Sequence, residues 1–179
     1  MSHLLDPQLL FQKSQLQAGM HVADFGCGRT GHVVFPASVI VGEGGLVYAV
    51  DILKDVLENV RKRADVQSLI NIHTIWSDVE KLGKTAIPAK SLDIVYLVNT
   101  LSHGQASFGA LDEADRLLRE KGRIVVVDWY KAAPSLGPKK EDFIDFSLVK
   151  SWATQRGYVV QEEFEAGAYH WGLVLFRQM

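Results

Sequence analysis

Two runs of almost uninterrupted apolar residues limit the fold of this chain most strongly. Leu92–Val98 reads LDIVYLV, and Arg123–Val127 reads RIVVV. A strand this apolar must be covered on both faces, as strands are in a parallel sheet with helices on either side. Sheets of this kind are built from strands and helices that alternate along the sequence. The rest of the chain should therefore show the same alternation.

The remaining predicted elements do alternate. Asp6 as an N-cap, followed by Pro7 at the first helical position, predicts a helix that runs to about Gln17. Apolar periodicity predicts further strands at residues 21–25, 46–50 and 71–77, and helices at 32–41, 54–64, 108–118 and 146–156. The stretch 131–140, which contains prolines and a glycine, is the one predicted long loop.

The end of the chain departs from this alternation. Strands are predicted at Tyr158–Phe164 and His170–Arg177, with only Glu165–Tyr169 between them. A crossover to a parallel strand needs a dozen or more residues, so the last strand should run antiparallel to its neighbours. We expect an α/β fold in three layers, with a seven-stranded, mostly parallel sheet. We also expect a single domain over residues 1–179, with an N-terminal helix in 1–18 and the core in 19–179.

Composition agrees with one globular domain and excludes several classes of protein. The 179 residues are 47% hydrophobic and 22% charged, and the net charge is −2, without the basic surplus of a dedicated nucleic-acid binder. The single cysteine, Cys27, cannot form an internal disulfide. The N-terminus lacks the layout of a signal peptide, and no apolar run approaches the ~18 residues of a membrane span. We therefore expect a cytoplasmic protein.

A glycine-rich loop follows the first predicted strand. Gly26, Gly28 and Gly31 match the pattern G-x-G-x-x-G, and Asp51 ends the second strand about 20 residues further on. This arrangement suits a nucleotide cofactor, because the glycines allow close approach of the backbone and the acid binds ribose hydroxyls. The alternative is a glycine turn that only packs a helix against a strand.

Asp24 bears on which cofactor the loop binds. A carboxylate two residues before the first glycine would repel the pyrophosphate of a dinucleotide, since like charges at a site of low dielectric constant cost energy. The same carboxylate suits a cofactor with a cationic amino-acid end, such as S-adenosylmethionine, which carries an ammonium and a sulfonium. Arg29 favours the opposite conclusion because it suits a phosphate, so the loop alone leaves both alternatives open.

At this point the chain resembles the class I S-adenosylmethionine-dependent methyltransferases, from about Gly19 to Arg177. Several segments are similar to the motifs of that family, in the order of its strands: residues 22–28, 47–51, 77–78, 92–95 and 117–128. Within the family, the chain looks like the small branch related to ubiquinone/menaquinone-biosynthesis methyltransferases. The resemblance implies a Rossmann-like methyltransferase fold, in which the last strand is antiparallel.

The resemblance also implies S-adenosyl-L-methionine as cofactor and suggests which residues bind it. Asp51 would hold the ribose, Asp78 would meet the adenine amino group, and the backbone of Asn99 would hold the methionine end. The full implied cofactor-binding set is Asp24, Gly26, Cys27, Gly28, Gly31, Asp51, Ile52, Ser77, Asp78, Val79 and Asn99. This chain departs from many members in having two residues, Arg29 and Thr30, between its second and third glycines.

Candidates for the acceptor site lie after the fourth and fifth predicted strands, at the edge where ligands bind in open α/β sheets. His103 is the one candidate for a catalytic role, as a base or a substrate contact, and the alternative is a polar loop residue. Trp129 and Tyr130 would form an aromatic wall for the substrate, or would simply cover the sheet. Tyr169 and His170 enter the last strand and would border this pocket. The histidines and Cys27 show no metal-ligand spacing, so no metal site is expected.

We therefore predict an enzyme of the transferase class that transfers a methyl group from S-adenosyl-L-methionine to a small-molecule acceptor by in-line displacement. Methyl transfer needs alignment more than a dedicated catalytic group, which agrees with the lack of a triad or carboxylate pair. Three alternatives remain open. An NAD(P)-dependent oxidoreductase shares the glycine loop, a non-catalytic partner subunit shares the cofactor site, and a methyltransferase acting on RNA or protein shares the fold. The sequence indicates neither the acceptor nor the oligomeric state.

Overall fold

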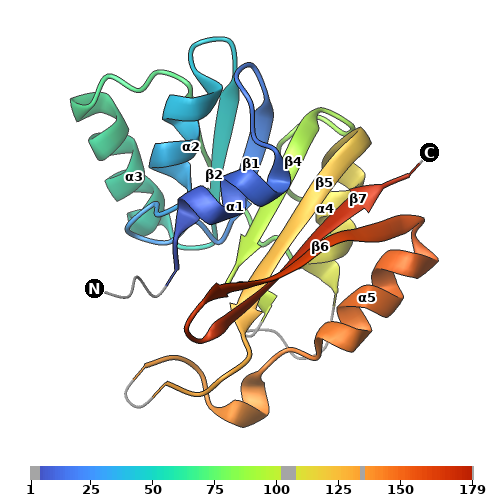
Figure 1. Cartoon of the computed structure of the whole chain (residues 1–179). Helices are drawn as coiled ribbons and strands as arrows, with labels where there is room; N and C mark the ends of the chain where they lie inside the picture. Colours follow the sequence, from blue (N-terminus) through green and yellow to red (C-terminus); the bar gives the residue numbers. More distant parts are fainter. Residues whose placement is uncertain (1–4, 102–107, 134–135, 179) are drawn as a thin grey trace.

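The computed structural model describes residues 5–101, 108–133 and 136–178. Its strands form one seven-stranded sheet in the order β3-β2-β1-β4-β5-β7-β6 (Figure 1). The strands are β1 (His21–Phe25), β2 (Leu46–Asp51), β3 (Ile72–Trp76), β4 (Leu92–Val98), β5 (Leu118–Trp129), β6 (Tyr158–Gly167) and β7 (His170–Arg177). All neighbours pair in parallel except β7, which is antiparallel to both β5 and β6. The predicted fold class and the antiparallel last strand are confirmed.

Helices cover both faces of the sheet (Figure 1). One face carries α1 (Pro7–Ser14), α2 (Val34–Val41) and α3 (Lys54–Val66), and the other carries α4 (Gly109–Leu117) and α5 (Phe146–Gln155). A short 3₁₀ helix, η2 (Lys140–Asp142), precedes α5. The alternate side chains of the central strands enter the two hydrophobic layers in turn, which accounts for the apolar runs in β4 and β5. Within the described residues, no helix is long and apolar enough to cross a membrane.

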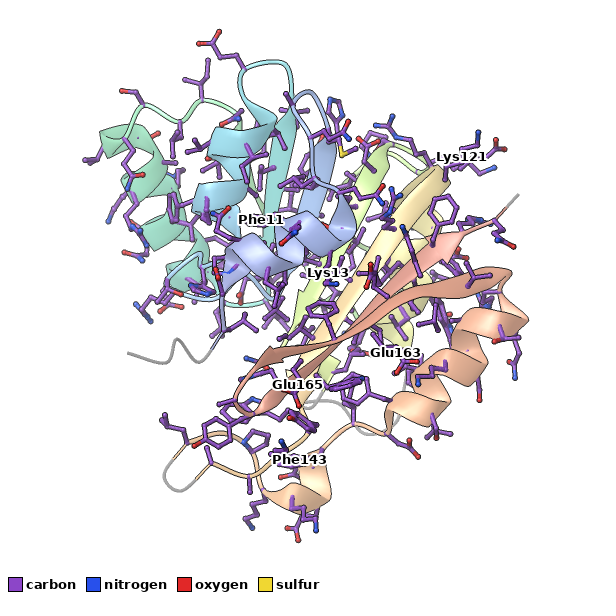
Figure 2. All side chains as sticks on the ribbon, viewed as in Figure 1. Phe11, Lys13, Lys121, Phe143, Glu163 and Glu165 are labelled. Carbon is purple, nitrogen blue, oxygen red and sulfur yellow. The ribbon has the colours of Figure 1, made fainter. Side chains whose placement is uncertain are left out.

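The N-terminal helix packs onto the sheet. Asp6 caps it as predicted, since its side chain accepts a hydrogen bond from the backbone N–H of Gln8 at 2.9 Å. Phe11, labelled in Figure 2, meets the ring of Tyr96 edge to face, with ring centroids 5.9 Å apart. The hydroxyls of Ser14 and Tyr96 are 2.8 Å apart and buried. The helix thus closes one side of the core.

Several element boundaries differ from the prediction, each for a local reason. Helix α1 ends at Ser14 rather than about Gln17, because Gln15 adopts the left-handed conformation that terminates a helix. Strand β5 begins at Leu118 rather than Arg123, because Leu118 already pairs with Leu92, before a register shift between Leu92 and Ile94 of β4. Strand β6 extends beyond Phe164 to Gly167, which lengthens the final hairpin.

Candidate functional site

Two cavities open along the edge of the sheet where the parallel strands end. One, of about 450 Å³, is called here the acidic cavity and is lined by Gly26, Asp51, Ile52, Leu53, Ser77, Asp78, Val79, Glu80, Asn99 and Thr100. The other, of about 440 Å³, is called the aromatic cavity and is lined by Leu5, Asp24, Gly26, Cys27, Gly28, His32, Val33, Val98, Asn99, Trp129 and His170. Both are lined by Gly26 and Asn99, so they meet there, at the ends of β1 and β4.

The glycine loop is tied to the end of β2. The backbone N–H groups of Gly26 and Cys27 both donate to the carbonyl oxygen of Val50, at 2.8 and 3.0 Å. Gly28 has φ +65°, and a Cβ placed on it would meet nothing within 4 Å. The loop therefore leaves open space at Gly28, where a ligand can approach the backbone closely.

Asp51 holds this loop and the residues after β2 together. Its Oδ2 accepts a hydrogen bond from the N–H of Gly28 at 3.1 Å, and its Oδ1 accepts one from Leu53 at 3.0 Å. The side chain is buried but still lines the acidic cavity. Each carboxylate oxygen has two lone pairs, so both oxygens keep the capacity to accept a second hydrogen bond from a ligand.

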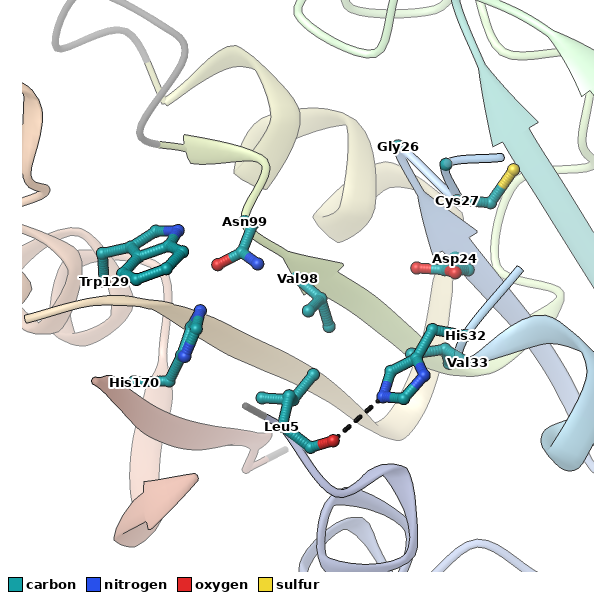
Figure 3. A pocket seen from close by; sticks show the side chains of 11 residues that line it. Leu5, Asp24, Gly26, Cys27, His32, Val33, Val98, Asn99, Trp129 and His170 are labelled. Carbon is teal, nitrogen blue, oxygen red and sulfur yellow. Dashed lines mark hydrogen bonds between the residues drawn. The ribbon is translucent and has the colours of Figure 1, made fainter. Parts of the chain in front are cut away.

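Asp24, near the end of β1, is one of the side chains that line the aromatic cavity (Figure 3), and it is almost wholly buried. Burial raises the pKa of its carboxyl to about 7, and the nearby charge of Asp51 adds to this. Within the described residues no lysine or arginine forms an ion pair with Asp24. Arg29, which we considered as a phosphate ligand, instead pairs with Asp55 of α3 at the surface. The region around the glycine loop is therefore suited to a cation.

Cys27 lines the aromatic cavity, close enough to Asp24 and Asp51 for both charges to act on its thiol. Burial, together with the charges of Asp24 and Asp51, raises the pKa of its thiol well above the usual range. A thiol that stays protonated is a poor nucleophile, so this environment does not favour catalysis by Cys27. Within the described part of the chain, no cluster of three or more His, Cys, Asp or Glu side chains is placed to hold a metal ion.

The far end of the acidic cavity is formed by the segment after β3. The side chain of Asp78 accepts a hydrogen bond from the backbone N–H of Glu80 at 3.2 Å, and Lys81 lies 3.3 Å from its other oxygen. Ser77 is buried, and its hydroxyl lies 3.0 Å from that of Thr85. The turn at Asp78 is therefore tied to the loop that follows it.

Glu113 of α4 holds that loop from behind. It is fully buried and accepts hydrogen bonds from the N–H groups of Gly83 and Thr85, at 2.7 and 2.9 Å. Arg116 donates two more to its carboxylate, both at 2.8 Å. Although burial raises the pKa of Glu113, these hydrogen bonds outweigh it and lower the pKa to about 2. The wall of the acidic cavity is thus attached to a helix of the opposite layer.

Asn99 lies where the two cavities meet. It directly follows β4 and adopts the left-handed conformation, with φ +54°, which asparagine tolerates better than most residues. Its backbone N–H donates to the carbonyl of Val127 at 2.8 Å. Its side-chain oxygen is buried and has no hydrogen-bond partner among the described residues. A buried acceptor without a donor costs free energy, so this atom is suited to receive a hydrogen bond from a ligand.

The structure brings most of the predicted cofactor residues to this edge, but not all. Gly31 lines neither cavity, and a Cβ on it would lie 2.6 Å from the ring of Phe35, so its place is in the turn before α2. Of the two predicted aromatic residues, Trp129 lines the aromatic cavity. Tyr130 does not, and its hydroxyl donates to Glu165 at 3.2 Å. His103 lies outside the described residues.

Sequence reasoning missed several lining residues altogether. In the aromatic cavity these include Leu5 and His32, whose Nε2 lies 3.1 Å from the Leu5 carbonyl oxygen (Figure 3). The others are Val33 and Val98 in that cavity, and Leu53, Glu80 and Thr100 in the acidic cavity. No motif marks Leu5 or His32, because only the docking of α1 brings them together. Leu53 could have been predicted as a lining residue, because it follows closely after Asp51 at the end of β2.

The fold and this edge define a Rossmann-like methyltransferase domain. A family model described as a methyltransferase domain matches residues 16–168, and the chain therefore belongs to that family, the S-adenosylmethionine-dependent methyltransferases. The chain is 36% identical to aklanonic acid methyltransferase DauC of Streptomyces sp. (strain C5) over 111 residues, 62% of this chain and 49% of that protein.

A second relative matches a longer stretch. The chain is 27% identical over 168 residues to the ubiquinone/menaquinone biosynthesis C-methyltransferase UbiE of Pseudoalteromonas translucida (strain TAC 125), 93% of this chain and 64% of that protein. The chain thus spans about half to two thirds of the length of these two curated relatives. A SAM-dependent methyltransferase from Aquifex aeolicus shares the fold, with a TM-score of 0.84 and 24% identity, covering 98% of this chain and 91% of that one.

Proposed function

We propose that this chain binds S-adenosyl-L-methionine along the two cavities and transfers its methyl group to a small-molecule acceptor. The observation that carries this proposal is the pair of buried carboxylates, Asp24 and Asp51, beside an open glycine loop. A buried carboxylate with no cation from the described chain favours a ligand that brings positive charge. The methionine end of the cofactor carries such charge.

In this proposal each part of the cofactor has its own protein partners. Asp51 accepts hydrogen bonds from the ribose hydroxyls with the oxygen capacity that Gly28 and Leu53 leave free. Asp78 and the backbone at Val79 meet the adenine. The methionine end lies along Gly28, with its ammonium within reach of the Asn99 side-chain oxygen.

When bound, the cofactor supplies an electrophilic methyl group on a positively charged sulfur. The chain's own residues then have two tasks. The aromatic cavity excludes water and aligns the acceptor, and the ordered glycine loop fixes the direction of approach. Alignment alone can supply ~7–11 kcal/mol of such a barrier, so methyl transfer does not require a triad.

The same glycine loop occurs in NAD(P)-dependent oxidoreductases, the alternative class of enzyme for this loop. Two features favour the methyltransferase. The dinucleotide fold has strand order 3-2-1-4-5-6 without an inserted antiparallel strand, whereas β7 here lies between β5 and β6. In addition, Asp24 would lie close to a pyrophosphate and repel it.

Calorimetric titration of the chain with S-adenosylmethionine and with NADH tests the proposal. We expect S-adenosylmethionine to bind and NADH not to bind, and the reverse result would overturn it. Turnover is tested separately by mass spectrometry over a panel of small molecules, an RNA oligonucleotide and the protein itself. Formation of S-adenosylhomocysteine only with RNA or protein would overturn the small-molecule part, and none with any acceptor would indicate a non-catalytic partner subunit.

A further inference from the structure

Trp129 and His170 form a fixed aromatic pair in the aromatic cavity. They face each other across β5 and β7 as direct cross-strand partners, and their ring centroids are 4.3 Å apart. Both side chains are buried, at 9% and 2% exposure. The indole is also packed against Gly137, where a Cβ would come within 2.8 Å of the ring. The pair is therefore held rigidly before any ligand binds, as a specific binding surface requires.

The charges around this pair limit which acceptor can bind. Among the described lining residues there is no lysine or arginine, and the one carboxylate, Asp24, lies at the cofactor end. A phosphorylated or carboxylated acceptor would find no lysine or arginine among these described residues, and burying an unpaired anion is costly. The other described lining near the pair is apolar at Leu5 and Val98 and carries one uncharged polar side chain, that of Asn99. The acceptor subsite is thus suited to an uncharged molecule.

The size and shape of the cavity limit the acceptor further. Its volume is about 440 Å³, and part of this must hold the methionine end of the cofactor. The space that remains suits a molecule with about one ring, lying against the indole face of Trp129. Aromatic rings prefer such offset or tilted contacts, which stabilise the pair beyond the burial of its surface.

We propose that the acceptor is an uncharged, single-ring phenol or enol, and that His170 accepts its hydroxyl proton during methyl transfer. The inference rests on the proposed function and adds the class of substrate and a catalytic residue. In Figure 3 the His170 ring stands beside Trp129 with its edge towards Asn99, where the two cavities meet. Histidine exchanges protons near neutral pH, which suits a base for this step.

The step balances as follows. The O–H bond of the acceptor breaks, and the proton goes to a ring nitrogen of His170. The electron pair left on oxygen forms the new bond to the methyl carbon. The bond between that carbon and sulfur breaks with its electron pair staying on sulfur, which becomes uncharged. The products are a methyl ether, S-adenosylhomocysteine and a protonated histidine that returns its proton to water.

A series of phenols of graded acidity tests the role of His170. An acidic nitrophenol loses its proton easily even without a base in the site, whereas an unsubstituted phenol depends on one. We expect His170→Gln to slow methylation of the weakly acidic phenols by about 100-fold or more, and of the nitrophenol by less than about tenfold. The matched control is His73→Gln, since His73 is on the exposed surface of β3 and lines neither cavity.

Equal slowing of all phenols by His170→Gln would overturn the role of the base, and a product methylated on a ring carbon would overturn the assignment to oxygen. Because His170 is buried, the thermal unfolding of each variant is measured first. The rate at which the parent protein methylates the same phenols is then measured as a function of phenol acidity. If His170→Gln does not fold, the parent protein alone decides the question. Its methylation rate is compared among the phenols at a pH below their pKa values. A rate that falls steeply as the phenol becomes less acidic overturns the proposal, since a working base makes that dependence shallow.

Binding of phenol without cofactor gives a readout independent of turnover. We expect calorimetry to show phenol binding that Trp129→Leu weakens by about tenfold. Trp152→Leu is the control, because Trp152 has similar burial, 7% exposed, but belongs to α5 and lines neither cavity. A chain that binds S-adenosylmethionine but neither binds nor methylates phenols would contradict this inference and leave the proposed function intact. A chain that does not bind S-adenosylmethionine would contradict the proposed function itself.

Discussion

Two buried carboxylates, Glu113 behind the acidic cavity and Asp24 in the lining of the aromatic cavity, are held in opposite ways. Glu113 receives four hydrogen bonds, two from Arg116, and its pKa is lowered to about 2. Asp24 is as well buried but has no cation from the described chain, and burial raises its pKa to about 7. The first is a structural group whose interactions are complete within the protein. The buried charge of Asp24 lowers the stability of the folded protein when no ligand is bound, which is typical of a group whose function is to bind a ligand.

Removing the charge of Glu113 should give the largest effect on stability. Glu113→Gln leaves Arg116 without its carboxylate and presents an amide N–H₂ to the N–H donors of the loop. Breaking one side of a buried ion pair costs about 3–5 kcal/mol of unfolding free energy, which urea unfolding at neutral pH measures. Glu163→Gln is the control, since its partly exposed ion pair with Lys150 should contribute less than about 1 kcal/mol.

The pH dependence of Glu113 follows from its lowered pKa. The folded pKa is about 2, below the ordinary value of 4.5, so the stabilisation is fully present above about pH 4.5. It is lost as the pH falls from there towards 2. If Glu113→Gln and the parent lose stability equally over that range, the carboxylate is not the structural anchor described above.

The ionised form of Asp24 should lower the stability of the folded protein, whereas that of Glu113 raises it, and the effect of Asp24 should be somewhat smaller. Its folded pKa of about 7 lies above the ordinary 3.8, so the folded state loses stability as the pH rises from about 4 to 7. Asp24→Asn removes that loss, and at pH 8 we expect a gain of a few kcal/mol, at most about 4. At pH 4 the two proteins should differ little, which serves as an internal control. Urea unfolding at both values measures the difference.

The same substitution should weaken the cofactor site. If Asp24 is kept for a cation, Asp24→Asn binds S-adenosylmethionine more weakly at pH 8, although it is more stable. In the parent protein, affinity should fall below about pH 7, because Asp24 must first lose its proton. A variant that is both more stable and equally tight in binding would break the comparison with Glu113.

Asp51 sharpens the comparison because it holds the glycine loop, as a structural group does, and is also proposed to bind the cofactor. Asp51→Ala removes the ribose acceptor and also the hydrogen bonds to Gly28 and Leu53, so we expect calorimetry to show at least tenfold weaker binding of S-adenosylmethionine. Asp51→Asn should do less harm, since one oxygen survives. That oxygen can serve only one of the two N–H groups, so some loss remains. Binding by Asp51→Ala as tight as the parent's would show that the ribose assignment is wrong.

The sequence allowed prediction of the cofactor side better than of the acceptor side, for a physical reason. The glycine loop follows β1 and Asp51 ends β2, which are neighbouring parallel strands, so local spacing is enough to place them together. Trp129 and His170 meet only because of the register between β5 and β7, which no local pattern sets. The early start of β5 at Leu118 was missed likewise, because it depends on pairing with Leu92 in a distant strand.

Asp78 should show the smallest effect of these carboxylates. Its side chain is partly exposed and already contacts Lys81 and the N–H of Glu80, so water and the protein compete with the adenine amino group for its oxygens. We expect Asp78→Ala to weaken S-adenosylmethionine binding less than Asp51→Ala does, by about threefold to tenfold. The loop itself should keep its place, because Glu113 still holds Gly83 and Thr85. Calorimetry of both variants, with thermal unfolding alongside, compares them directly. If Asp78→Ala proves the more damaging, the adenine end contributes more to binding than the ribose end.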